Sequence, residues 1–339
     1  MKKNKIIIIE LLFIILIIVF FISIFQGYSN ITYKEVIKLL LNKIGFYNNA
    51  NLPEYVETII IIVRLPRIIL AILIGAALAV SGCVMQGIFR NVMAGPYTTG
   101  IASGASFGAA LFINFGFSLK FVTAGAFLFS IFTAFFVYLL AVKNSYLQKE
   151  RLILSGMVIS LFFSSLVSFI QYLSSDPNLR EIIFWIMGGF WKANWHSVKI
   201  VLPIILILII LLNTYYRELN ALLLSEEEAK SLGINCKKVR MIILIFSSLL
   251  TASAVSVSGI IAFIGLICPH IMRLIIGSDN KYLLIASALA GSILLLITDT
   301  LSRSIVYPVE IPVGILTSLL GVPFFIFLLK RHKKSNQIL

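Results

Sequence analysis

Residues 2–25 read KKNKIIIIELLFIILIIVFFISIF, in which three lysines precede an apolar run from Ile6 to Phe25 that holds a single charged residue, Glu10. A helix needs about 20 apolar residues to cross the hydrocarbon core of a bilayer, so this run is long enough. A cleaved signal peptide has a shorter apolar core, about 7–15 residues, with small residues at a cleavage site after it. No such site follows here. We therefore predict an uncleaved first transmembrane helix.

The composition of the whole chain has the same character. Of its 339 residues, 60% are hydrophobic and 12% are charged, whereas about 25% of the residues in an average soluble protein are charged. Too little polar surface remains to cover a water-soluble globule. The net charge of +14 is compatible with nucleic-acid binding, but the basic residues lie between apolar runs rather than along one polar face. We therefore interpret them as orientation signals and expect no nucleic-acid partner.

Further apolar stretches are bounded by charges or turn residues along the chain. The predicted spans lie near 6–26, 68–89, 98–115, 121–142, 152–173, 198–216, 241–258, 260–273, 282–301 and 311–329. The eighth is short and is interrupted by Gly265 and Pro269, and without it the count is nine. The predicted fold class is all-α: a polytopic membrane protein of about ten helices, with residues 1–339 as one domain.

Lysine and arginine determine the predicted orientation. With the N-terminus in the cytoplasm, most of the 28 basic residues, including the cluster from Lys330 to Lys334, fall on the inner side of the cell membrane. Both termini are therefore predicted to be cytoplasmic. Two outer segments, residues 27–63 and 174–197, are long enough to carry structure. We expect an amphipathic helix near 32–45 and a short interfacial helix within Ile182–Trp195, whose tryptophans would anchor it at the headgroups.

Small residues recur at helical spacing in two of the predicted spans. Gly100, Gly104 and Gly108 follow one another at intervals of four, and Gly75 and Ala79 do the same in the preceding span. Such positions let helix backbones approach closely in lipid. The pattern predicts a tightly packed bundle.

The predicted cytoplasmic segment 217–240 contains signals for a short helix. Ser225 and Glu228 have the spacing of a capping box, and Gly233 suits a C-terminal cap. From spacing alone, this helix is either a solvated connector or a docking element for a cytoplasmic partner. Its residues of interest are Ser225, Glu226, Glu227, Glu228, Ala229, Leu232 and Gly233.

Three arginines fall on the outer side, against the charge bias. Arg64 and Arg67 flank Pro66, which we place in the first position of the second span, and Arg303 follows Asp299 by four residues, so that an ion pair along one helix is available. The arginines therefore either pair within the chain or form a cationic patch that receives the acidic groups of a partner protein.

The sequence shows no catalytic or metal-binding pattern. It has no G-x-x-x-x-G-K-[ST] phosphate loop, no nucleophile–base pair stands out, and its three histidines lie far apart. We expect His270, next to Pro269, to bond freed backbone rather than a ligand. If ATP energises this protein, the ATP and Mg²⁺ belong to another chain.

Ordered motifs over residues 60–330 resemble the FecCD family of permeases. The first is Arg64-Leu-Pro-Arg67, followed by residues 75–82 and Gln86. The loop Arg90-Asn91-Val92-Met93-Ala94 with Pro96 and Gly100 is similar to the family's RNPLA-x-P-x-x-LG, apart from Val92 in place of a proline and Thr99 in place of a leucine. The match continues through Ala229–Gly233, through Gly259–Arg273 with Gly265, Pro269, His270 and Arg273, and through Glu310-Ile-Pro312-Val-Gly314.

The resemblance implies a permease that pairs with a second copy or a paralogue, with two ATP-binding-cassette ATPases inside and an extracytoplasmic binding protein outside. The helix at 225–233 would couple to the ATPase, and Arg64, Arg67 and Arg303 would receive glutamates of the binding protein. The fifth and tenth spans would line the pathway, with Lys149 and Glu150 near its cytoplasmic gate. The expected cargo is an iron complex, first a siderophore, with haem or cobalamin as alternatives.

Two other classes of function remain as alternatives. An ion-coupled secondary transporter would need acidic residues inside the membrane, and only Glu10 and Asp299 qualify, each near the end of a span. A passive channel or sensor subunit would need no energy source.

Overall fold

The computed structural model describes residues 2–27, 31–43, 53–143, 146–224, 226–306 and 309–335. Within these ranges, seven helices are long and apolar enough to cross a membrane. They are Lys3–Phe25, Glu54–Phe89, Leu119–Ala141, Glu150–Leu173, Trp195–Thr214, Cys236–Ser258 and Asn280–Ser302. Shorter apolar helices cover Ile101–Asn114, Ile264–Ile276 and Val313–Ile326. Together they match the ten predicted spans, and the all-α prediction is confirmed.

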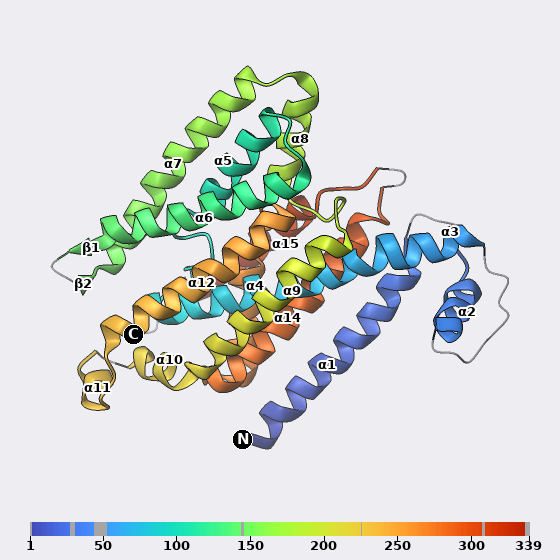
Figure 1. Cartoon of the computed structure of the whole chain (residues 1–339). Helices are drawn as coiled ribbons and strands as arrows, with labels where there is room; N and C mark the ends of the chain where they lie inside the picture. Colours follow the sequence, from blue (N-terminus) through green and yellow to red (C-terminus); the bar gives the residue numbers. More distant parts are fainter. Residues whose placement is uncertain are drawn as a thin grey trace.

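Figure 1 shows the arrangement of these elements. The helices in chain order are α1 (Lys2–Phe25), α2 (Tyr33–Lys43), α3 (Glu54–Glu57), the π-helix η1 (Thr58–Arg64), α4 (Leu65–Phe89), α5 (Ile101–Asn114), α6 (Leu119–Ala141), α7 (Lys149–Leu173), α8 (Asp176–Met187), α9 (Trp195–Thr214), α10 (Tyr216–Leu223), α11 (Glu226–Ser231), α12 (Cys236–Ser258), α13 (Ile264–Ile276), α14 (Asn280–Ser302) and α15 (Val313–Ser335). Two short strands, β1 (Val142–Lys143) and β2 (Tyr146–Leu147), pair antiparallel between α6 and α7.

Both ends of the described chain lie on the same side of the bundle. Figure 1 shows the two termini at the end that also carries α10, α11 and the β1–β2 hairpin, while α2, α3 and α8 lie at the opposite end. An even number of crossings requires this placement. We call the first the inner end and the second the outer end.

Helix α4 is the centre of the bundle and contacts α12, α13 and α14. Its closest neighbour is α14, where a side chain added at Gly75 would collide with the backbone of Gly291, and one added at Gly291 would collide with Gly75 and with Ala79. The Ser292 hydroxyl also donates to the Ile72 carbonyl at 2.8 Å. The small-residue pattern of the second span therefore serves close helix packing, as predicted.

The second span begins earlier than predicted. The helix starts at Glu54 rather than near residue 68 and runs without interruption through η1 into α4. Pro66 lacks a backbone N–H, so the regular hydrogen-bond pattern is broken next to it, and the π-helical segment Thr58–Arg64 lies directly before it. Pro66 therefore lies inside a long helix, and the expected position of Arg64 ahead of the helix was wrong.

The outer helix in segment 174–197 also differs from the prediction. It covers Asp176–Met187 rather than Ile182–Trp195, with a proline in its first turn, a signal that the sequence did contain. Trp185 is buried within the protein, and the Trp195 indole donates to the Ile61 carbonyl at 2.8 Å. These two tryptophans thus serve contacts within the chain, rather than the expected anchoring in lipid.

The eighth span is shifted rather than broken. The irregular backbone lies at residues 259–263, where Gly259 and Phe263 have φ of 67° and 69°, and α13 then continues through Pro269 to Ile276.

The predicted amphipathic helix near 32–45 is present as α2. Its start is a capping box in which Thr32 and Glu35 exchange hydrogen bonds. The Glu35 carboxylate accepts from both the N–H and the hydroxyl of Thr32, and these two bonds lower its pKa.

We predict that Gly75→Leu lowers the free energy of unfolding by about 1–3 kcal/mol, because the new side chain must force α4 away from α14. Thermal unfolding of the purified protein in detergent measures this. Ala124→Leu, on an exposed face of α6, is the matched control and should leave the melting temperature unchanged. Equal melting temperatures for both variants and the wild type would contradict the assigned packing.

Candidate functional site

Two of the three outer arginines, Arg67 and Arg303, pair with one buried carboxylate. Asp299 is fully buried and accepts from Arg67 Nε at 2.9 Å through Oδ1, while its Oδ2 lies 3.4 Å from Arg303 Nε. The second pair is the i,i+4 ion pair that the sequence offered. Arg67 also donates through Nη1 to Glu310 Oε2 at 2.8 Å. A carboxylate without water must be paired to stay charged, and two arginines do this here.

Arg64 and Arg303 also bond the end of α1. Arg64 Nη1 donates to the Ile24 carbonyl at 2.6 Å, and Arg303 donates to the carbonyls of Ser23 and Gln26 at 3.2 Å each. The last carbonyls of a helix have no partner within the helix and carry partial negative charge, so cations favour this position. The arginines therefore fasten α1 to α4 and α14.

The structure thus brings the three predicted docking residues together, but beneath the outer surface. Their exposed fractions are 3% for Arg64, 5% for Arg67 and 9% for Arg303. Of the two interpretations offered by the sequence, contacts within the chain account for all three side chains, and a cationic surface patch is not needed. The side chain of Glu310 is 42% exposed, so the carboxylate on Arg67 is the accessible member of the cluster.

We predict that Asp299→Asn lowers the free energy of unfolding by about 3–5 kcal/mol, because it leaves buried arginines without their counter-ion. Glu310→Gln removes a partly exposed partner and should cost less than about 1 kcal/mol. Thermal unfolding in detergent compares the two variants. A loss at residue 310 equal to that at residue 299 would show that the buried carboxylate is not the centre of the cluster.

At the inner end, α11 has the predicted glycine cap. Gly233 adopts φ of 77°, its N–H bonds the Lys230 carbonyl at 2.9 Å, and the Ile234 N–H bonds the Ala229 carbonyl at 3.2 Å. These two bonds form a Schellman motif. Ala229 is buried whereas Leu232 is 64% exposed. Glu226, Glu227 and Glu228 form the first turn, and Ser225, the predicted capping residue, lies outside the described residues.

Hydrogen bonds connect the region of α11 to the centre of the bundle. Helix α10 precedes α11, and the carbonyl of its Leu222 accepts from Arg90 Nε at 2.8 Å. Arg90 ends α4 in a left-handed conformation, with φ of 50°. On the other side of α10, the Asn220 side chain bonds both Asp279 and Asn280. The start of α14 is thereby fixed to α10.

The loop after α4 packs against α13. Ala94 is buried, the Asn91 side chain accepts from the Met93 N–H at 2.9 Å, and Pro96 lies where a side chain on Gly265 would have to go. Arg273 donates to Gln86 at 2.8 Å, which joins α13 to α4. Asn220 and the Gln86–Arg273 pair were not predicted, because the sequence separation between each side chain and its partner hides the contact.

The remaining predicted residues lie at the start of α7 and around α15. Lys149 begins α7 after the β1–β2 hairpin, and Glu150 beside it is exposed. At the outer end, Pro312 directly precedes α15, and the Gly314 N–H lies 3.3 Å from the Gly188 carbonyl. His270 packs edge-on against Phe324 of α15, with ring centres 6.2 Å apart.

A cavity of ≈ 590 Å³ lies between α8, the 259–263 segment and α15. The backbones come close at this point, since a side chain on Gly314 would meet the carbonyls of Met187 and Ile260. The only side-chain hydroxyl on the cavity wall is that of Ser318, which donates to the Gly314 carbonyl at 2.8 Å. The wall is otherwise apolar and carries no charged side chain among the residues that line it. They are Ile186, Met187, Ile260, Ala262, Gly314, Ile315, Ser318, Leu319, Val322 and Pro323.

Comparison with known proteins gives matches over most of the chain. The FecCD transport family matches residues 15–331. A hemin transport system permease from Yersinia pestis is 41% identical over 81% of this chain and 84% of its own. An Fe(3+)-citrate import system permease from Bacillus subtilis is 38% identical over 99% of this chain and 98% of its own. A solved structure, reported as an inward-facing metal-chelate type ABC transporter, superposes with a TM-score of 0.85 at 36% identity, covering 96% of this chain and 99% of that one.

Proposed function

This chain belongs to the FecCD transport family and is a permease subunit of an ATP-binding-cassette importer, and we propose that its cargo is an iron complex, a ferric siderophore. The observation that carries this proposal is the apolar wall of the cavity at α8 and α15. Bare metal ions are bound by carboxylate, imidazole or thiolate ligands, and none of these lines the cavity. A chelate whose own donors saturate the iron needs none of them. Haem and cobalamin meet the same condition and are the alternatives.

The energy source and the partners follow from the family. Its permeases work with ATPase and substrate-binding partners. In our proposal, two ATPase subunits at the inner end hold the ATP and Mg²⁺, an extracytoplasmic binding protein delivers the complex at the outer end, and a second copy or a paralogue completes the pathway. Both termini are then cytoplasmic. The permease itself carries out no covalent chemistry.

We assign the coupling to the ATPase to α11, because it is a capped helix that presents an exposed leucine at the inner end. Movement of α11 would displace α10, which contacts it in the bundle. The Arg90–Leu222 hydrogen bond would then transmit the movement to α4, and the hydrogen bonds of Asn220 to Asp279 and Asn280 would transmit it to α14. Alternating access would then shift α7 and α15, which line the pathway, with Lys149 and Glu150 near the inner gate.

Uptake by cells lacking the gene tests the cargo. We expect loss of uptake for one ⁵⁵Fe-labelled chelate in a panel of hydroxamate, catecholate and citrate complexes, with restoration by the plasmid-borne gene. Loss of haem or cobalamin uptake alone would replace the proposed cargo by that alternative. Unchanged uptake of every compound in the panel would contradict an iron complex as the cargo.

We predict that Leu232→Asp lowers the affinity of the permease for its ATPase about tenfold or more, because an apolar anchor of the interface is lost. Co-purification or biolayer interferometry in detergent measures the affinity. Val309→Asp makes the same chemical change at an exposed outer position and should leave it unchanged. Wild-type affinity in the Leu232 variant would remove α11 from the ATPase interface.

Arg64 and Arg303 already bond backbone carbonyls at the end of α1, so Arg67 is the arginine proposed to receive the binding protein. A carboxylate of the binding protein must then replace that of Glu310 on Arg67. Glu310→Gln should therefore raise docking affinity about two- to fivefold, as a partly exposed competing ion pair is removed. Glu181→Gln is the matched control, because Glu181 pairs with Lys192 at similar exposure on the same outer side. Weaker docking in the Glu310 variant would mean that Glu310 itself contacts the partner and Arg67 does not.

A further inference from the structure

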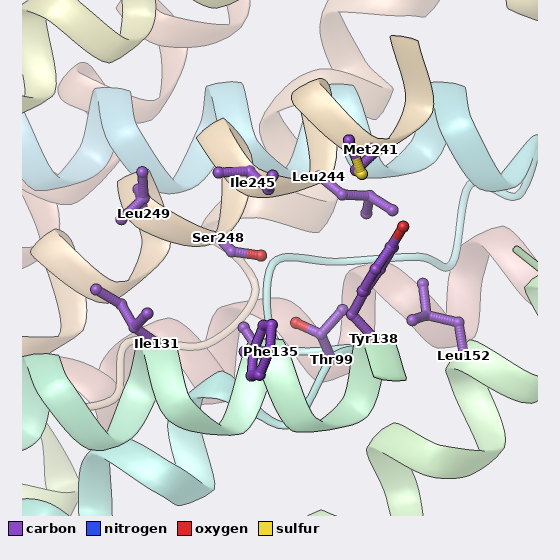
Figure 2. Close-up of a pocket in the computed structure, with 11 residues that line it drawn as sticks. Thr99, Ile131, Phe135, Tyr138, Leu152, Met241, Leu244, Ile245, Ser248 and Leu249 are labelled. Atoms are coloured by element: carbon purple, nitrogen blue, oxygen red, sulfur yellow. The ribbon is translucent and has the colours of Figure 1, made fainter. Parts of the chain in front are cut away.

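A second cavity, of ≈ 350 Å³, opens between α6 and α12, with Leu152 at the inner end of α7 also on its wall. Figure 2 shows the two helices facing each other across it. Its wall is mainly aliphatic and aromatic. It is formed by Ile131, Ala134, Phe135 and Tyr138 of α6, Met241, Leu244, Ile245, Ser248 and Leu249 of α12, and Leu152 and Thr99. We call this space the α6–α12 groove.

The groove contains hydroxyl groups at membrane depth. Figure 2 shows the oxygens of Thr99 and Ser248 turned into the space between the helices, with the Tyr138 ring crossing it. Thr99 is 3% exposed, and its Oγ1 has no hydrogen-bond partner among the residues that the structure describes. A buried hydroxyl without a partner costs free energy. The hydroxyl groups of Tyr138 and Ser248 belong to partly exposed residues and are the ones that an occupant of the groove can reach.

The inner rim of the groove is basic. On α12 the lining residues recur with helical spacing, and the same face continues one turn inward from Met241 to Lys237 and Lys238, both of which are exposed. The exposed Arg151 lies next to Leu152 at the start of α7. Three acidic side chains are exposed in the neighbouring elements, Glu150 on α7 and Glu227 and Glu228 on α11, together with the basic Lys230 on α11. On the face of α12 that lines the groove, the two exposed charged side chains at the rim are both basic, so this part of the rim favours an anion.

We propose that the α6–α12 groove binds one anionic phospholipid of the inner leaflet. One acyl chain lies along Ile131, Phe135 and Leu249, the glycerol-ester region reaches the hydroxyl of Tyr138, and the phosphate lies between Lys237 and Lys238. Basic pockets between transmembrane helices on the cytoplasmic side are suited to such headgroups. Lipid is also the medium that reaches an apolar opening at this depth.

Occupancy of the groove would brace the inner half of α12. This helix follows α11 in the chain, and its inner half faces both the groove and the rim. The bound lipid would therefore hold the base of the coupling region at a fixed depth in the membrane. The lipid site depends only on the membrane-spanning fold and stands independently of the proposed cargo.

Native mass spectrometry of the full-length permease in detergent tests the proposal. Phosphatidylglycerol and phosphatidylcholine with identical acyl chains are the two probes. We expect one tightly bound phosphatidylglycerol and weaker binding of phosphatidylcholine. Ala134→Phe, which fills the groove, should lower the affinity for phosphatidylglycerol at least tenfold, whereas Leu128→Phe, on an exposed part of the same helix, should not.

A charge variant tests the rim without changing the groove. Lys237→Gln and Lys238→Gln should each reduce the preference for phosphatidylglycerol about fivefold, the effect expected of one basic residue at an anionic surface. Lys199→Gln, at the outer end of α9, is the control. Equal binding of the two lipids by the wild type would overturn the proposal, and so would unchanged phosphatidylglycerol binding in Ala134→Phe. Cross-linking of the groove residues to a second copy of the chain, with no lipid retained, would assign the groove to a protein interface instead.

Discussion

Lipid cannot solvate a charge or a backbone polar group, and the fold of this chain follows from that constraint. Asp299 shows its effect most clearly, since the carboxylate is fully buried and is held by Arg67 and Arg303. Arg64 and Arg303 in turn satisfy the last carbonyls of α1. One buried acid thereby ties three helices that are distant in sequence, and the close α4–α14 contact at Gly75 and Gly291 completes a rigid centre.

The same constraint bears on the source of energy. Within the described spans, Asp299 is the only fully buried carboxylate. Its negative charge is already balanced by Arg67 and Arg303, so it does not bind a coupling ion. An ion-coupled transporter needs such a group exposed to its pathway. The elements at the inner end instead connect a displayed helix, α11, to the centre through Arg90 and Asn220. This arrangement suits a permease that receives mechanical work from a separate ATPase, in agreement with the family to which the chain belongs.

Local patterns in the sequence predicted what local physics determines. The apolar lengths identified the seven helices long enough to cross a membrane and the three shorter apolar helices. The small residues Gly75 and Ala79 predicted close helix packing, and Gly233 predicted the end of α11. Tertiary contacts determined the rest. The i,i+4 spacing predicted the Arg303–Asp299 pair. Arg67 and Glu310 are 243 residues apart, so no spacing rule could show that Arg67 is paired inside the protein. The start of the second span at Glu54 was missed because Pro66 reads as a helix start, whereas a π-helical segment lets the helix pass through it.

The central claim is that ATP hydrolysis on a partner chain, rather than an ion gradient, drives transport through this permease. Proteoliposomes containing this chain with its ATPase, and with the binding protein outside, test it directly. Uptake of a ferric siderophore should require ATP inside the vesicles and should be unaffected by ionophores that collapse proton and sodium gradients. Uptake that proceeds without ATP and stops when those gradients are collapsed would contradict the account.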